Sequence, residues 1–102
     1  MTVHISGAAA RNIIAVARRH IDRIGAEHIP VVVWIVRDTQ TRSDTPRLGV
    51  GFIERDLVEA GRFLRCDEFN CEIAQHIPDS VLEQYAHPYI DILDEELVFA
   101  ER

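Results

Sequence analysis

The feature that most constrains the fold is an unbroken apolar run in the first half of the chain. Ile29-Pro30 leads into Val31-Val32-Val33-Trp34-Ile35-Val36, which is rich in β-branched residues that favour strands. Both alternating sets of side chains are apolar, so we expect a central strand that is covered on both faces. The run is too short to cross a bilayer as a helix, and no membrane association is expected.

A long amphipathic helix is predicted before this strand. Ser6 can cap its amino end because its hydroxyl accepts a hydrogen bond from a first-turn amide, and Gly25 can close it in the left-handed conformation. His20 lies on or beside the apolar stripe of this helix, where we expect a buried, hydrogen-bonded ring. The stripe is formed by apolar residues at steps of three and four: Ala9, Ile13, Val16, Ala17, Ile21 and Ile24.

A second strand is predicted where Leu48, Val50 and Phe52 alternate with Gly49 and Gly51, and it should form a hairpin with the first. The glycine face has no side chains, so we expect it to lie close to another backbone. The connection, residues 37–47, is polar and long for a hairpin loop in so small a domain, which is typical of functional or disordered loops. Its charged residues are predicted to form an interaction loop: Arg37, Asp38, Arg42, Asp44 and Arg47.

The second half of the chain predicts shorter elements. Residues 54–61 favour a loop with one helical turn, followed by a short strand at Phe63 and Leu64. Alternation of apolar and polar residues over 69–73 predicts a half-buried strand. Pro78 ends this strand. A short helix capped by Asp79 or Ser80 is then predicted over Val81–Tyr85. Two closing strands are predicted after it, over Tyr89–Leu93 and Leu97–Phe99.

Length and charge limit the classes of function. The 102 residues are enough for one hydrophobic core, so residues 1–102 are expected to form a single α+β domain. The net charge of −6 argues against a nucleic-acid partner. The charge divides unevenly, about +3 over residues 1–50 and −9 over 51–102, which could steer a protein partner. With two cysteines and no apparent signal peptide, a cytoplasmic location is expected.

The candidate metal ligands are Cys66, Cys71 and His76, with Asp67 adjacent. A metal site requires thiolate and imidazole groups at roughly 2 to 2.5 Å from one ion. On a strand, five residues span about 16 Å, and Cys66 and Cys71 would project to opposite faces. The three side chains can therefore meet at one ion only if the chain turns at Asp67-Glu68. The simpler interpretation of Cys71 is a small core residue beside Phe69.

A family resemblance covers most of the chain in short segments: Val3-His4-Ile5-Ser6-Gly7-Ala8-Ala9 with Ile13, Val31 to Val36, Leu48 to Glu54, Cys71-Glu72-Ile73 through Pro78-Asp79-Ser80-Val81-Leu82, and Tyr89-Ile90-Asp91-Ile92. In these segments the chain resembles the HesB/IscA-like family of iron–sulfur cluster assembly proteins. The resemblance implies a small mixed β-sheet or pseudobarrel with one long N-terminal helix and one short helix.

The departures from this family concern its ligands. Members that carry iron or a cluster use one cysteine just after the first long strand and a closely spaced pair in a C-terminal tail. Here the first location falls within residues 37–43, which contain no cysteine, and the chain stops at Arg102 without such a tail. Because thiolates are the ligands that hold iron–sulfur centres, the family's cofactor role does not carry over residue by residue.

Two functions are therefore expected from the sequence. The first is a non-catalytic, HesB-like accessory or protein-binding module without a cofactor, whose partner is another protein or a second copy of the chain. The second is an iron-binding or iron–sulfur cluster transfer protein in which Cys66, Cys71 and His76 from two subunits replace the missing ligands.

Overall fold

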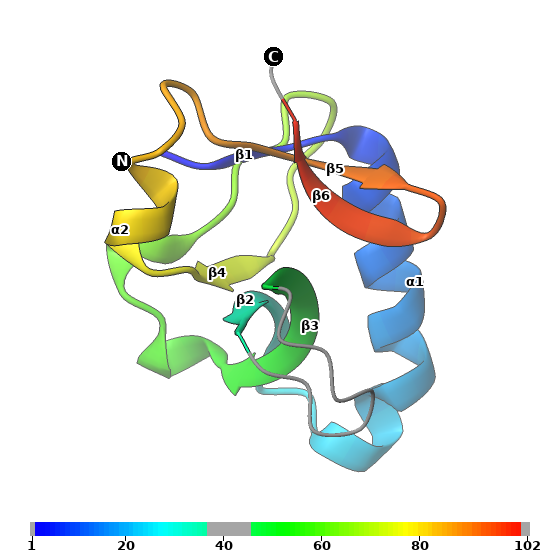
Figure 1. Ribbon diagram of the computed structural model, residues 1–102. Helices are drawn as coiled ribbons and strands as arrows, with labels where there is room; N and C mark the ends of the chain where they lie inside the picture. The colour runs from blue at the N-terminus through cyan, green and yellow to red at the C-terminus, as the bar shows by residue number, and fades with distance from the viewer. Residues whose placement is uncertain (1, 37–45, 101–102) are drawn as a thin grey trace.

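Two small mixed sheets and two helices make up the computed structural model, which describes residues 2–36 and 46–100. The first sheet has the order β1-β5-β6, with β1 (His4–Ile5) parallel to β5 (Tyr89–Leu93) and β6 (Glu96–Ala100) antiparallel to it. The second has the order β3-β2-β4 and contains β2 (His28–Ile35), β3 (Arg47–Glu54) and β4 (Ala74–His76). Figure 1 shows α1 (Gly7–Ile24) along one side of both sheets. The α+β class is confirmed.

The predicted hairpin and its central strand are confirmed. Strand β2 pairs antiparallel with β3 from His28↔Glu54 to Ile35↔Arg47, and parallel with β4 on its other side. The two faces of β2 belong to different clusters. Val32 packs in the main core, whereas Ile29 and Val31 form a second cluster with Ala74. The β3-β2-β4 sheet therefore has an inner face towards the main core and an outer face on its other side.

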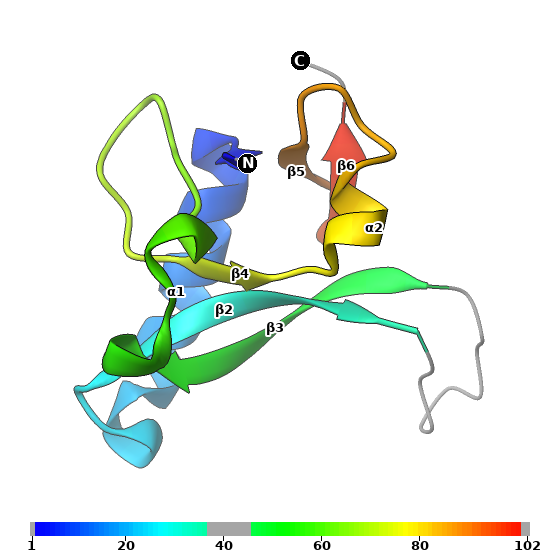
Figure 2. The same cartoon turned by 90° about the vertical axis from the view of Figure 1, so that its left-hand side faces the viewer.

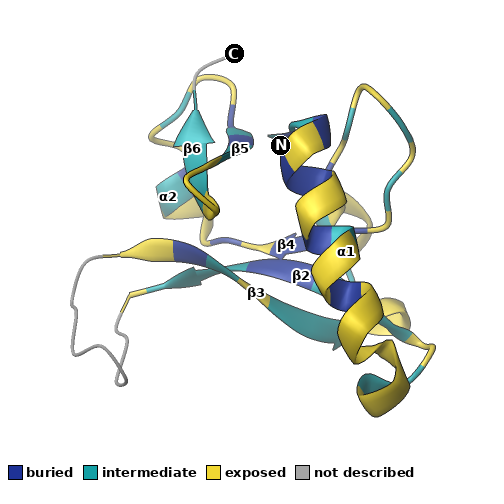
Figure 3. Cartoon of the chain, turned by 90° about the vertical axis from the view of Figure 1, so that its right-hand side faces the viewer, coloured by how far each residue is buried: buried dark blue, intermediate teal, exposed yellow. Residues whose placement is uncertain are grey.

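Helix α1 begins where the sequence predicts. The Ser6 hydroxyl accepts a hydrogen bond from the Ala9 amide at 3.1 Å, and Gly25 follows the last turn with a φ of 104°. The apolar stripe is buried only in its first part, because the β1-β5-β6 sheet lies beside the amino-terminal part of the helix (Figure 3). Val16 and Ile21 are each 37% exposed. The prediction for His20 is wrong, since this residue is exposed and its ring meets Phe52 edge-on.

The main core lies between α1 and the two sheets. Its members are aliphatic residues from every part of the chain: Val3, Ile5, Ala9, Ala10, Ile13, Val32, Leu48, Leu64, Ile73, Ile77, Leu82 and Ile90. The small residues Ala9 and Ala10 are completely buried, which allows α1 to approach the sheets closely. No described helix is long and apolar enough to span a membrane.

The middle of the chain differs from the prediction in three ways. The strand predicted over 69–73 is wrong: the strand is β4, which begins at Ala74 because the backbone of residues 74–76 pairs with β2. The predicted helical turn in residues 54–61 appears as two 3₁₀ turns, η1 (Arg55–Leu57) and η2 (Ala60–Arg62). Helix α2 spans Asp79–Leu82, and its N-cap is Pro78, so neither predicted side-chain cap is made.

The closing strands are confirmed as a hairpin. Leu93 pairs with Glu96, which leaves a two-residue connection, and both of its residues have positive φ (Asp94 51°, Glu95 66°). Two left-handed residues are the geometry of a type I′ turn, whose twist matches that of an antiparallel hairpin.

The glycine face of β3 is covered by side chains rather than by another backbone, so that prediction is wrong. A Cβ at Gly49 would overlap Ile35 Cδ1, whereas the nearest atom to a Cβ at Gly51 would be Val31 Cγ1 at 3.8 Å. The neighbouring strand β2 therefore folds an isoleucine side chain over the position that Gly49 leaves open.

Candidate functional site

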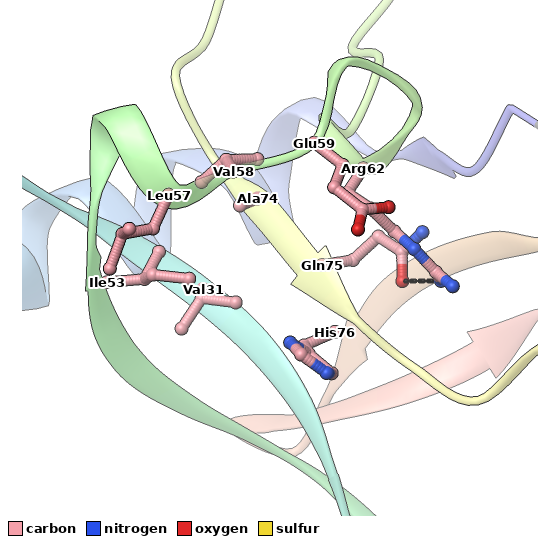
Figure 4. Close-up of a pocket in the computed structure, with 9 residues that line it drawn as sticks. All are labelled: Val31, Ile53, Leu57, Val58, Glu59, Arg62, Ala74, Gln75 and His76. Carbon is pink, nitrogen blue, oxygen red and sulfur yellow. Dashed lines mark hydrogen bonds between the residues drawn. The ribbon is translucent and has the colours of Figure 1, made fainter.

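A cavity of about 150 Å³ lies on the outer face of the β3-β2-β4 sheet, beneath the segment that contains η1 and η2. Figure 4 shows apolar side chains along one side of it and polar side chains along the other. The apolar lining residues are Val31, Ile53, Leu57, Val58 and Ala74, and the polar ones are Glu59, Arg62, Gln75 and His76.

The polar side of the cavity is held by Arg62. Its Nη1 donates to the carbonyl oxygen of Ile77 at 2.9 Å and lies 3.4 Å from Gln75 Oε1, while its Nη2 donates to Asp79 Oδ1 at 3.0 Å. Gln75 is 2% exposed, and its Oε1 also accepts from the Ile77 amide at 2.8 Å. Because these bonds join η2, β4 and the start of α2, the polar wall is fixed by tertiary contacts.

The apolar side is partly open to solvent. Val31 and Ala74 are buried at its base, whereas Leu57 is 67% exposed at its rim. A cavity of about 150 Å³ with apolar walls is large enough to hold a benzene-sized ring. Convergent polar groups at the edge of an apolar pocket are typical of binding sites. The arrangement can therefore accept one large apolar side chain or ring and offer it a polar rim.

The three candidate metal ligands do not come together in the chain. His76 lines the cavity on the outer face of the sheet, whereas Cys66 and Cys71 line a separate open hollow of about 650 Å³. No group of three or more histidine, cysteine, aspartate or glutamate side chains suited to a metal ion occurs among residues 2–36 and 46–100.

The two cysteines, by contrast, are brought close to each other. The chain bends at residues 67–69, which supplies the turn that their convergence requires. The Cys71 thiol receives backbone hydrogen bonds from Ile73 and from Cys66 itself, and its sulfur lies 4.0 Å from the carbonyl oxygen of Leu64. Both thiols are free, half-buried and packed against the main core.

Burial raises the pKa of the Cys71 thiol, and the neighbouring Cys66 raises it further. The two backbone hydrogen bonds act in the opposite direction but are the smaller influences. At neutral pH Cys71 is therefore held as the protonated thiol, which is a poor metal ligand and a poor nucleophile.

The short loop between the cysteines is fixed to the amino end of α1. Arg11 of α1 forms an ion pair with Glu68 at 2.8 Å, and its guanidinium lies 5.5 Å from the ring centroid of Phe69. The carboxylate of Glu68 also lies over Gly7, where a Cβ would come within 3.0 Å of it. Asp67 contacts the side chains of His4 and Arg65 at 3.8 and 3.9 Å.

The predicted interaction loop falls largely outside the described residues. Of its charged members, Arg37, Asp38, Arg42 and Asp44 lie outside them, and Arg47 is the exposed first residue of β3, opposite Ile35. No sequence pattern indicates the cavity, because its lining comes from β2, β3, β4 and the 3₁₀ turns, and each of these segments contributes only a few residues.

The comparisons with known proteins assign this chain to no family. The resemblance to HesB/IscA-like proteins thus stays a prediction from the sequence. Neither the family models, nor the curated proteins, nor the solved structures yield a match to this chain.

Proposed function

We propose that this chain is a non-catalytic protein-binding module, and that the cavity on the outer face of the β3-β2-β4 sheet receives one large apolar side chain of a partner protein. The observation that carries the proposal is the cavity itself, which combines a buried apolar base, an exposed apolar rim at Leu57 and a fixed polar wall at Arg62. Protein interfaces concentrate their binding energy in such anchor pockets.

The chemistry of the rim suits a peptide segment. A side chain that fills the apolar part leaves its own backbone near the exposed Glu59 and His76, whose polar groups can meet backbone donors and acceptors. The volume of about 150 Å³ suits a leucine, methionine or phenylalanine side chain rather than a cofactor-sized ligand. We therefore expect a partner that presents one such residue in an extended segment.

The HesB-like part of the proposal concerns the scaffold. The order of elements supports it, since a long N-terminal helix, two paired strands, a short helix and a following strand succeed one another as the resemblance implies. Under this proposal the chain is a HesB-like domain that has lost iron–sulfur ligation, and the charged loop over 37–47 adds a second contact surface.

Peptide selection tests the proposed binding site. Random linear peptides displayed on phage are selected against the immobilised chain, and the dissociation constants of enriched peptides are measured by calorimetry. We expect these peptides to share one large apolar residue. Replacing Leu57 by Ser should raise their dissociation constants by about 5- to 30-fold, because burial of a leucine side chain contributes about 1.5–3 kcal/mol and part of Leu57 is already covered.

Leu93 provides the matched control, because it is 63% exposed, almost as much as Leu57 at 67%, but does not line the cavity. The Leu93→Ser variant should bind the selected peptides as the wild type does. Peptides without a shared apolar residue, or equal losses in the two variants, would contradict the proposal.

The iron-binding alternative requires ligands from two chains, because His76 is separated from both cysteines within one chain. Anaerobic reconstitution with iron and sulfide, followed by visible absorption and metal analysis, tests it directly. We expect colourless, metal-free protein. A chromophore that disappears in the Cys71→Ser variant would replace the binding-module proposal with cluster chemistry.

A further inference from the structure

The two cysteines lie opposite each other on neighbouring chain segments. Figure 2 shows the chain leaving η2, forming a loop and returning to β4. The two arms of this loop pair antiparallel: Phe63 bridges Ala74, and the Leu64 amide donates to the carbonyl oxygen of Ile73 at 2.8 Å. Beyond this pair the arms diverge into the loop, where the Cys66 amide donates to the Cys71 sulfur and both cysteines line one hollow.

This arrangement suits a covalent bond between the sulfurs. A disulfide requires two Cα atoms about 4.4–6.8 Å apart, a spacing that is reached between neighbouring arms of a loop of this kind. The hydrogen bond from the Cys66 amide to the Cys71 sulfur places that sulfur against the backbone of the opposite cysteine.

Both thiols can also be reached from solvent. They line the open hollow of about 650 Å³, whose other walls include Thr2, Arg65 and Asn70. We propose that Cys66 and Cys71 form a redox-active dithiol, which a low-molecular-weight disulfide such as glutathione disulfide oxidises to an intramolecular disulfide. This inference is independent of the proposed peptide-binding function.

The reaction proceeds by two thiol–disulfide exchanges. The Cys66 thiol loses its proton to solvent, and the thiolate attacks one sulfur of the small disulfide. A mixed disulfide forms, and one small thiolate leaves and takes up a proton. Cys71 then loses its proton and attacks the Cys66 sulfur, which releases the second small thiol. The two protein thiols lose two electrons, and the small disulfide gains them.

Cys66 is assigned the first attack because backbone groups of the two arms crowd the Cys71 thiol. The Cys71 thiol is surrounded by the backbone of Leu64, Cys66 and Ile73, which hinders approach of an external disulfide. Cys71 therefore acts as the resolving thiol, which needs to reach only the sulfur opposite it.

Mass spectrometry of the intact chain tests the proposal. The reduced wild-type protein is incubated with a mixture of reduced and oxidised glutathione, quenched with acid and weighed. We expect a monomer that has lost two hydrogen atoms and carries no glutathione. The Cys71→Ser variant should instead retain one glutathione, because the resolving thiol is missing, and should acquire it faster than the Cys66→Ser variant. Wild-type protein with two glutathione adducts, or disulfide-linked dimers as the main product, would overturn the proposal.

A second probe tests proximity without oxidation. Phenylarsine oxide binds two neighbouring thiols through one arsenic atom, so the reduced wild type should bind it about 100-fold more tightly than either serine variant, since the second thiol is already in place. Circular dichroism confirms that each variant is folded. Equal affinity of the folded wild type and folded variants would show that the sulfurs do not converge.

Discussion

Replacement of Ser6 by Ala should remove a contact that joins the two ends of the chain. The Ser6 hydroxyl accepts a hydrogen bond from the Ala9 amide at 3.1 Å and donates one to Asp91 Oδ1 at 2.7 Å. The first bond caps α1, and the second connects the start of the helix with β5. The same carboxylate oxygen accepts from the Ile92 amide at 2.8 Å. One oxygen atom of Ser6 therefore serves both secondary and tertiary structure.

The two bonds set the size of the effect. Loss of a serine N-cap costs about 1 kcal/mol. A hydrogen bond to a charged group contributes about 1.5–3 kcal/mol when buried, and partial exposure reduces this to about 0.5–1 kcal/mol here. We therefore expect Ser6→Ala to lower the free energy of unfolding at pH 7 by about 1.5–2 kcal/mol, which corresponds to a fall in Tm of roughly 6–12 °C.

The pH dependence separates the two contributions. The hydrogen bond from Ser6 is the main cause that lowers the pKa of Asp91, and the one from Ile92 acts in the same direction. A lowered pKa stabilises the fold at pH values above the unfolded pKa of about 3.9, and this stabilisation is lost as pH falls through the folded pKa. The cost of Ser6→Ala should therefore shrink at low pH towards that of the helix cap alone.

Urea unfolding followed by circular dichroism, at neutral pH and at about pH 2.5, measures this change. A double-mutant cycle with Asp91→Asn should give a coupling of about 0.5–1 kcal/mol at neutral pH. Ser80→Ala is the matched control, because Ser80 is exposed in α2, whose cap is made by Pro78 without a side-chain bond. A pH-independent cost of Ser6→Ala, or a similar cost for Ser80→Ala, would refute the reasoning.

Three further predictions concern stability. Gly51→Ala should raise the free energy of unfolding by about 0.4–1 kcal/mol because its new Cβ makes only ordinary contacts, whereas Gly49→Ala should lower it by up to about 1 kcal/mol because the tip of the Ile35 side chain must rotate away; urea unfolding compares them. His28→Phe should be neutral or stabilising by up to about 1 kcal/mol in thermal unfolding, because the buried Nδ1 of His28 has no hydrogen-bond partner within residues 2–36 and 46–100. Oxidation of the cysteine pair should raise the free energy of unfolding by about 2 kcal/mol through closure of a six-residue ring, and an unchanged Tm in the oxidised monomer would contradict this.

The elements with strong local patterns could be predicted from the sequence. Ser6 and Gly25 mark the ends of α1, and β2 and β3 follow from their runs of β-branched and alternating residues. These signals are local, because caps and periodicity act within a few residues. Even there, burial was not determined locally. Val16 and Ile21 belong to the apolar stripe, yet they are exposed because the β1-β5-β6 sheet does not extend along the whole helix.

The candidate sites were decided by tertiary structure. Strand β4 exists because Ala74 to His76 pair with β2, more than forty positions earlier in the chain, and no periodicity within residues 69–76 could indicate where that pairing begins. The same pairing turns His76 towards the cavity and away from the cysteines. The bend at 67–69 then brings Cys66 and Cys71 together, although a regular strand would have separated them.

The sequence by itself thus determined the α+β class, the long helix and the two hairpins, since local backbone preferences and the burial of apolar residues suffice for these. Only the tertiary structure decided which polar side chains share a site. The cavity draws its lining from strands and turns that meet only in the folded chain, and the cysteine pair depends on two arms that pair across a bend. Contacts between distant segments depend on the packing of the whole domain, and this packing leaves no pattern in any one segment.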